Sequence, residues 1–237
     1  MYVGNSPRFP TSVFAIFDND KPEAVGTCFA ISDTLLLSCQ HFMNGNVKKY
    51  RIALTAQKSD GVVHFTGERN VIVLRYNREM DYALLGLSDE PHNLDPIPLS
   101  LHPVEADIDV KVFHFPVTTF NDSANGSISP FTAWVKTSIA TRHHLPCGGP
   151  GLYKGSSGAP YVLRSGGAVA LHMEAVNDAK TVDFEDDANA DAKLEVLSST
   201  VNSNANSHGS ISSGLLIGQC PKLVAILKEF DVATGST

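Results

Sequence analysis

The chain has 237 residues, of which 43% are hydrophobic and 18% are charged, and its formal net charge is −7. This length suits one large all-β domain or two smaller halves, and four cysteines are too few for a fold that depends on disulfides. The acidic balance argues against nucleic-acid binding, and no apolar run approaches the roughly 18 residues of a membrane-spanning helix.

Short segments rich in β-branched and aromatic residues dominate the first half of the chain, and Asn, Asp, Gly and Pro separate them. The predicted strands are 13–17, 26–31, 34–38, 49–54, 70–74 and 81–87. Strands at this spacing, with almost no helical periodicity between them, favour a barrel or a sandwich.

Four prolines between residues 91 and 103 indicate a connector between two halves, 1–95 and 96–220. The predicted strands of the second half are 110–115, 133–136, 160–163 and 168–172. Residues 174–212 are rich in Asp, Asn, Ala and Ser, so we expect a long loop or a disordered insertion there.

One helix is predicted, at 221–231. Pro221 suits a first helical position, because proline lacks the N–H that the first turn would leave without a partner anyway. Leu223, Ile226, Leu227 and Phe230 then recur near the 3.6-residue helical period, which predicts one apolar face.

The segment 155–160, Gly-Ser-Ser-Gly-Ala-Pro, is the sharpest chemical feature of the sequence. A serine hydroxyl is a weak nucleophile that needs a neighbouring base and N–H groups aimed at the developing oxyanion. Gly155 lets the backbone turn so that its N–H and that of Ser157 point into one hole, and no side chain blocks the substrate. A plain Gly/Ser turn between strands is the alternative interpretation.

Two residues of the first half could serve Ser157. His41 ends the apolar run 35–38, and Asp81 directly precedes the apolar run 82–85. Each has a structural alternative, as a turn histidine and as a strand-capping acid. Together they make the chain order His41, Asp81, Ser157, which is the order of the two-barrel serine proteases and differs from that of other serine hydrolases.

On these motifs the chain resembles the chymotrypsin/trypsin-like (PA clan) serine peptidases over nearly its full length. The residues of the motifs are most similar to those of the intracellular Deg/HtrA-type and nuclear trypsin-like proteases. The landmarks are 26–31, 37–41, 81–85, 96–99, 112–116, 155–160, 168–172 and the terminal helix. The resemblance implies an all-β fold of two perpendicular six-stranded β-barrels with a C-terminal α-helix. His41 and Asp81 would lie in the N-terminal barrel and Ser157 in the C-terminal barrel.

The resemblance also implies a role for each residue. Ser157 is the acyl-forming nucleophile, and His41 is the general base and then the general acid. Asp81 holds the tautomer of His41 and stabilises its protonated form. The N–H groups of Gly155 and Ser157 form the oxyanion hole. The function implied is that of a serine endopeptidase acting on protein or peptide substrates, with no cofactor and no metal.

The sequence departs from the secreted members at two places. Ser156 stands where their zymogens carry an Asp that pairs with a newly cleaved N-terminus. No cysteine comes directly after His41, so the usual disulfide beside the histidine is missing. Activation by N-terminal insertion is therefore not expected, which leaves loop ordering, homo-oligomerisation or substrate binding to form the oxyanion hole.

The substrate pocket is predicted from the same resemblance. Its base is Gly151, six residues before the nucleophile, where no acid is placed to attract Lys or Arg. The walls would come from Leu152, Tyr153, Lys154, Ala170, Leu171, His172 and Met173. A neutral pocket of this kind favours an apolar or aromatic residue before the scissile bond.

The net charge of the chain is concentrated in one segment. Residues 174–195 hold eight acids and two lysines, a local charge of −6, directly after a strand that edges the cleft in this family. A solvated loop explains this, and an electrostatic gate that selects substrates or partners by charge is the sharper hypothesis.

Several alternatives compete with the serine peptidase. Cys147 begins a Cys-Gly-Gly-Pro sequence, but it lacks a glycine two residues earlier and no strand is predicted after it. A zinc site would need ligands without any standard paired spacing: Cys28, Cys39, His41, His143, His144 and Cys147. An α/β-hydrolase needs a helix after the nucleophile, where a strand is predicted.

The remaining alternative is a catalytically silent, protease-like protein-binding module.

The start of the chain lacks the features of a signal peptide, so we expect an intracellular location, with Cys28 and Cys39 as free thiols.

Overall fold

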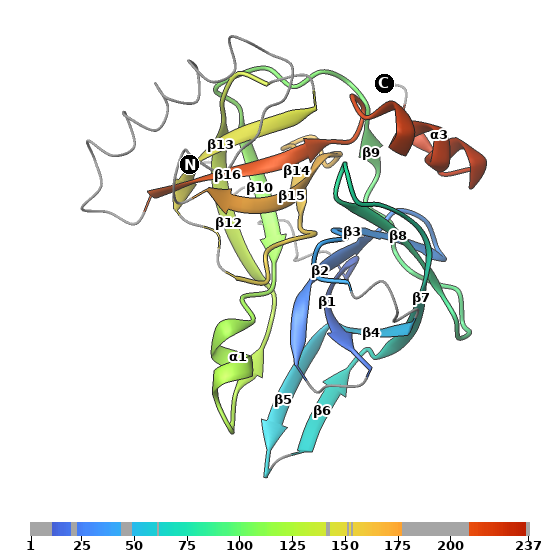
Figure 1. The fold of residues 1–237 in the computed structure, drawn as a ribbon, viewed down its shortest axis with the longest axis vertical. Coiled ribbons are helices and arrows are strands. Elements are labelled where there is room, and N and C mark those ends of the chain that lie inside the picture. Colours follow the sequence, from blue (N-terminus) through green and yellow to red (C-terminus); the bar gives the residue numbers. More distant parts are fainter. Residues whose placement is uncertain are drawn as a thin grey trace, which may run out of the picture.

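The computed structural model describes residues 11–19, 23–43, 49–60, 62–140, 143–150, 152, 154–176 and 209–235. These residues form two closed six-stranded antiparallel barrels, which lie against each other in Figure 1. The all-β fold expected from the sequence is confirmed, including the C-terminal helix.

The first barrel closes in the strand order β1–β2–β3–β8–β7–β4. Its strands are β1 (Val13–Asp18), β2 (Ala24–Ala30), β3 (Leu35–Ser38), β4 (Lys49–Ala53), β7 (Arg69–Asn77) and β8 (Tyr82–Leu87). The predicted strands of the first half correspond to these six, with boundaries shifted by at most a few residues.

The second barrel runs β14–β10–β12–β13–β16–β15 and closes because β14 also pairs with β15. Its strands are β10 (Asp109–His114), β12 (Phe131–Thr137), β13 (His144–Pro150), β14 (Pro160–Val162), β15 (Ala168–Val176) and β16 (Gly209–Leu216). The short strands β9 (Leu99–Ser100) and β17 (Thr234–Gly235) extend this sheet beside β15. The predicted boundary at residue 95 lies in the segment between β8 and β9.

A small third sheet links the two halves at the bottom of Figure 1. The hairpin of β5 (Thr55–Ser59) and β6 (Val62–Thr66) follows β4, and β5 pairs with β11 (Ser127–Ile128) from the second half. The short helix α1 (Thr118–Asp122) precedes β11. None of these four elements is predicted by the sequence pattern, because each is short and the hairpin strands are largely exposed.

The core consists of three clusters of buried side chains, two inside the barrels and one between them. Successive residues of β1 alternate between clusters: Phe14 and Ile16 fill the first barrel, whereas Val13, Ala15 and Phe17 face the cluster between the barrels. Because both faces of such a strand are buried, its sequence is a continuous apolar run rather than an alternating one.

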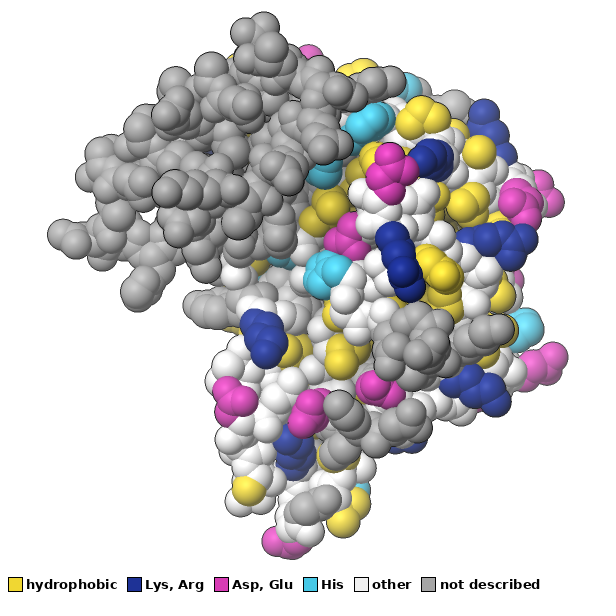
Figure 2. Space-filling model, viewed as in Figure 1, with side chains coloured by type: hydrophobic (Ala, Val, Ile, Leu, Met, Phe, Trp, Pro, Cys, Tyr) yellow, Lys and Arg dark blue, Asp and Glu magenta, His cyan; other side chains and the backbone are white. Residues whose placement is uncertain are grey.

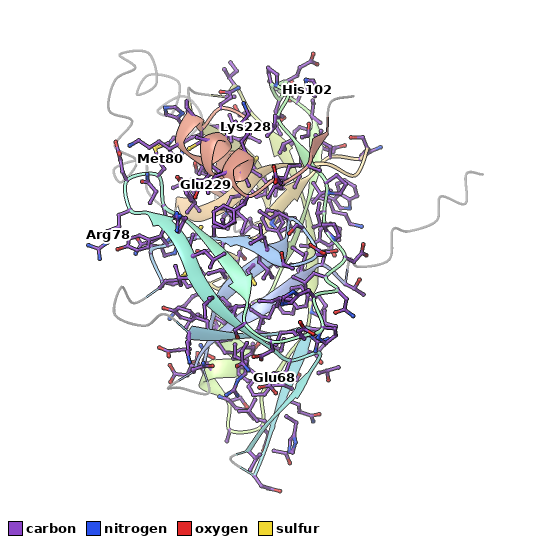
Figure 3. All side chains as sticks on the ribbon, turned by 90° about the vertical axis from the view of Figure 1, so that its right-hand side faces the viewer. Glu68, Arg78, Met80, His102, Lys228 and Glu229 are labelled. Atoms are coloured by element: carbon purple, nitrogen blue, oxygen red, sulfur yellow. The ribbon has the colours of Figure 1, made fainter. Side chains whose placement is uncertain are left out.

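Helix α3 (Pro221–Glu229) begins at Pro221 as predicted and buries Leu223 and Leu227. In Figure 3 it lies across the turn that carries Met80, while Arg78 points away from the molecule. Two ion pairs join the helix to this part of the first barrel, Lys222 to Glu79 at 2.5 Å and Arg75 to Glu229 at 2.9 Å. The helix therefore packs against the turn from which Asp81 enters the site.

The prediction of a long loop or disordered insertion at 174–212 is wrong at both ends. Residues 174–176 belong to β15 and residues 209–212 to β16, which pair with each other and complete the barrel. Five of the first six residues of β16 are Gly or Ser, which conceals this strand in the sequence. The intervening residues, and with them most of the acidic segment, lie outside the described part of the chain.

All four cysteines are free and buried, including Cys28 and Cys39 as predicted. Among the described residues, no helix is long and apolar enough to cross a membrane. On the face shown in Figure 2, the described acidic and basic side chains are interspersed rather than gathered by sign.

Candidate active site

His41 enters the site from the turn that follows β3, where the N–H of Met43 donates to the carbonyl of Gln40 at 2.8 Å. Its side chain is 46% exposed, and Nδ1 lies 2.6 Å from Oδ2 of Asp81. The ring contacts that of Phe42 edge-on, with centroids 5.4 Å apart. The buried strand thus delivers a histidine whose outer edge remains open to a substrate.

Asp81 ends the turn before β8 in the left-handed region, with φ +49°. Aspartate is one of the few residues that tolerate this conformation. Its Oδ1 accepts the N–H groups of His41 at 2.7 Å and of Gln40 at 3.0 Å. The side chain is 14% exposed, so the carboxylate is largely shielded and fixed by three hydrogen bonds.

The Asp81 carboxylate determines which tautomer of His41 is present. An ionised carboxylate only accepts hydrogen bonds, so Nδ1 of the neutral ring carries the proton and donates it to Oδ2. The Nε2 atom is then left with a lone pair, which is the form that a general base requires.

The loop 154–159 that carries Ser157 adopts two left-handed glycine conformations, at Gly155 (φ +99°) and Gly158 (φ +89°). A Cβ at Gly155 would lie 2.5 Å from the carbonyl oxygen of Phe115 and collide with Val117. A Cβ at Gly158 would overlap the carbonyl oxygen of Thr27. Both positions require glycine, for conformation and for space.

Hydrogen bonds to the four carbonyls from Lys154 to Ser157 hold this loop. The donors are Val117 N to Lys154 O at 3.0 Å, Thr27 Oγ1 to Gly155 O at 2.7 Å, Ala159 N to Ser156 O at 2.9 Å, and Thr27 N to Ser157 O at 2.9 Å. In a trans peptide the N–H points opposite to the preceding C=O. The N–H of Gly155 therefore faces away from Val117, and the N–H of Ser157 faces away from Ala159.

The hydroxyl of Ser157 donates to the carbonyl of Met173 at 3.0 Å. No hydrogen bond joins Ser157 to His41 among the residues that the structure describes. The structure thus brings His41 and Asp81 together directly, whereas Ser157 lies on the adjoining loop with its hydroxyl turned toward β15.

Ser156, where the secreted zymogens carry Asp, is fully buried. Its hydroxyl lies 2.8 Å from Nδ1 of His114, a buried residue at the end of β10. Burial lowers the pKa of His114 from 6.5 to about 4, so the ring is neutral at pH 7. The contact between Ser156 and His114 is thus a hydrogen bond between two neutral, buried side chains.

The predicted pocket residues fall in different environments. Gly151 and Tyr153 lie outside the described residues, and Lys154 is exposed. Leu152 and Ala170 belong to the core of the second barrel, and Leu171 to the core between the barrels. Contact of these residues with a substrate stays a prediction.

His172 is buried, and its Nδ1 lies 2.9 Å from the hydroxyl of Tyr161, which donates to Ser212 Oγ at 3.1 Å. Burial, with smaller contributions from His114 and His41, lowers the pKa of His172 to about 3. The ring is therefore uncharged at neutral pH.

The alternatives with other chemistry fit the structure poorly. Cys147 lies within β13, and burial raises the pKa of its thiol to about 12, which makes it a poor nucleophile. Of the proposed zinc ligands, the described part of the chain gathers only Cys39 and His41, with Asp81, their ligand atoms lying within 4.8 Å of one another. Two ligands of a tetrahedral zinc lie about 3.3 Å apart, whereas the His41–Asp81 contact of 2.6 Å is a hydrogen bond.

Comparison with known proteins decides the family. The profile of the trypsin-like peptidase domain matches residues 26–171, more than half of the chain and the segment that holds His41, Asp81 and Ser157. The chain belongs to the trypsin-like peptidase family. A search of curated protein sequences found no match to this trypsin-like peptidase.

Solved structures share the fold at low sequence identity. The active form of the Rv3671c protease from M. tuberculosis is 14% identical with a TM-score of 0.59, covering 97% of this chain and 85% of that one. An inactive form of the same protease is also 14% identical, with a TM-score of 0.57, and the match covers 92% of this chain and 89% of that one. The serine endoprotease from Yersinia pestis is 15% identical, with a TM-score of 0.59, and the match covers 95% of this chain and 65% of that one.

Three groups that shape this trypsin-like peptidase site are not predicted by the sequence. Thr27 and Val117 hold the nucleophile loop, and the carbonyl of Met173 holds the Ser157 hydroxyl. Thr27 lies in the landmark 26–31 and Met173 is a predicted pocket wall, but no local motif marks their contacts with the nucleophile loop. Two of the three groups act through backbone atoms, and Thr27 lies 128 residues from Gly155, its hydrogen-bond partner.

Proposed function

We propose that the protein is a serine endopeptidase that cleaves peptide bonds through an acyl-enzyme on Ser157. The family supports peptidase activity, and the single observation that carries the mechanism is the His41–Asp81 hydrogen bond of 2.6 Å beside the nucleophile loop. This bond leaves Nε2 of His41 as the base for the serine proton.

In the proposed reaction, the Ser157 hydroxyl first leaves the carbonyl of Met173, which takes one rotation about the Cα–Cβ bond. Ser157 Oγ then attacks the scissile carbonyl carbon, and its proton passes to Nε2 of His41. The N–H groups of Gly155 and Ser157 stabilise the oxyanion. His41 protonates the leaving amine, and water then hydrolyses the ester by the same route.

The specificity pocket is proposed to be neutral and to favour an apolar or aromatic residue before the scissile bond. Support comes from Gly151, six residues before Ser157, where the sequence places no acid, and from the low pKa of His172, which leaves that ring uncharged. A peptide-library cleavage profile tests this proposal. Dominance of any charged residue at that position would overturn it.

A fluorophosphonate probe tests the mechanism, because it reacts only with an activated serine. We expect covalent labelling of the wild-type protein on Ser157 and none of Ser157→Ala. Ser156→Ala is the matched control, since it removes the neighbouring hydroxyl and keeps the proposed nucleophile.

The second candidate is a catalytically silent binding module. The observation that favours it is the hydrogen bond of the Ser157 hydroxyl to Met173 rather than to His41. Absence of labelling in the wild-type protein, with and without peptide substrates, would favour this module over the enzyme.

A further inference from the structure

Thr27 lies in β2 of the first barrel, yet its polar groups bind the second half of the chain. Its N–H donates to Ser157 O at 2.9 Å, and its hydroxyl donates to Gly155 O at 2.7 Å. The same hydroxyl accepts the N–H of Phe115 at 3.1 Å. Thr27 is fully buried, so water does not compete for these bonds.

The hydroxyl of Thr27 acts on the peptide unit between the two proposed oxyanion donors. The N–H of Gly155 lies on one side of this unit and the N–H of Ser157 on the other. Glycine has more backbone freedom than any other residue, so without this bond the Gly155–Ser156 peptide could rotate and displace the two N–H groups that flank it. Of the four bonds that hold these carbonyls, only the one to Gly155 comes from a side chain.

We propose that Thr27 is a positioning residue that holds the oxyanion hole of the second barrel from the first barrel. Its hydroxyl fixes the orientation of the peptide between Gly155 and Ser156, and its backbone N–H fixes the peptide between Ser157 and Gly158. Docking of the two barrels and formation of the hole are thereby one event. This inference rests on the proposed function of Ser157.

The side chain needs a hydroxyl rather than only the volume of threonine. Valine has nearly the same shape, but it can neither donate to Gly155 O nor accept from Phe115 N. Both backbone groups would then be buried without these partners, and the loop could move to satisfy them. Serine keeps the hydroxyl and loses only a methyl group.

The experiment compares Thr27→Val with Thr27→Ser in steady-state peptide cleavage and in the rate of fluorophosphonate labelling. We expect Thr27→Val to lower kcat and the labelling rate about 10- to 100-fold, with KM changed less than about threefold, because the hole acts in the transition state. Thr27→Ser should recover both rates to within about threefold of wild type.

Ser38→Ala is the matched control. The Ser38 hydroxyl is fully buried and donates to the carbonyl of Thr27 at 2.7 Å, so the variant removes a buried hydrogen bond from the same residue. It leaves the bonds to Gly155 and Ser157 in place, and its kcat should stay near wild type. Thermal unfolding of every variant separates loss of fold from loss of rate, and Thr27→Ala replaces Thr27→Val if the latter does not fold.

The outcomes distinguish this inference from the proposed function. No labelling of the wild-type protein at Ser157 would overturn both. Normal wild-type labelling with wild-type rates in Thr27→Val or Thr27→Ala would overturn only the role of Thr27. A rate loss equal in Thr27→Ser and Thr27→Val, or equal in Ser38→Ala, would also overturn it, because packing rather than the hydroxyl would then be responsible.

Discussion

The two barrels contribute to the candidate site in different ways. The first barrel supplies the His41 and Asp81 side chains, which bind each other at 2.6 Å with His41 46% exposed. The second supplies a loop whose backbone is held at four successive carbonyls, largely by buried groups. A base must reach a substrate and can be exposed, whereas an oxyanion hole is useful only if its N–H groups are already in place.

The largest effect on activity should come from the exposed histidine that the first barrel supplies. We expect His41→Ala to lower kcat/KM by about four orders of magnitude or more, because members of a catalytic triad act as a unit. The melting temperature should change little, since the ring is 46% exposed. His64→Ala, in the exposed hairpin strand β6, is the control. Activity near wild type in His41→Ala would mean that another group is the base.

Asp81→Asn tests how much of that effect depends on the tautomer. The amide can replace the carboxylate in shape, but its NH₂ group would favour the imidazole with the proton on Nε2, so kcat should fall about 10³- to 10⁴-fold. Asp60→Asn is a suitable control, because Asp60 has a similar φ of +52° and is exposed. A loss below tenfold would contradict the role of Asp81.

Gly155→Ala tests the loop backbone that the second barrel supplies. The added Cβ would meet the Phe115 carbonyl at 2.5 Å, and the peptide could not keep φ +99° without strain. We expect kcat to fall about 10²- to 10³-fold, as for loss of one oxyanion donor.

Gly166→Ala is the control for Gly155→Ala. Gly166 has nearly the same φ, +101°, but nothing lies within 4 Å of its added Cβ. Equal kcat losses in the two variants would show that backbone strain in general, and not the oxyanion hole, limits the rate.

The smallest effect concerns stability and pH. Burial lowers the pKa values of His114 and His172 to about 4 and about 3, below the ordinary 6.5 of the unfolded chain. Between pH 6.5 and about 4 the unfolded state therefore binds more protons, so the folded state loses stability as the pH falls. The slope should be at most about 1.4 kcal/mol per pH unit for each histidine.

Urea unfolding at pH 7.0, 6.0 and 5.0 measures this slope, and His114→Gln should reduce it by the share of one histidine. His102→Gln, at an exposed position, should leave it unchanged. A stability that stays constant from pH 7 to pH 5 would contradict the assignment of two buried neutral histidines.

The apolar strands could be predicted from the sequence because their physical causes are local, and the three proposed catalytic residues could be predicted from their motifs and chain order. Leu35, Leu36 and Leu37 form a short apolar run next to turn residues, which is typical of a buried strand, and His41 lies in the turn that follows. Strand β16 could not be read in this way. Its Ser-rich sequence becomes a strand only because β13 and β15 offer backbone partners on both sides.

By itself, the sequence determined that the chain is all-β, that glycines flank a serine, and that His41, Asp81 and Ser157 follow one another in a known order. The strands and the glycine turn depend on the backbone preferences of neighbouring residues, whereas the order of the three residues is read directly from the chain. Only the tertiary structure decided that Thr27 binds Gly155, that Val117 binds Lys154 and that the Ser157 hydroxyl faces Met173. Such hydrogen bonds join residues far apart in the chain. The bond from Thr27 to Gly155 exists only once the two barrels have packed, because its partners belong to different halves.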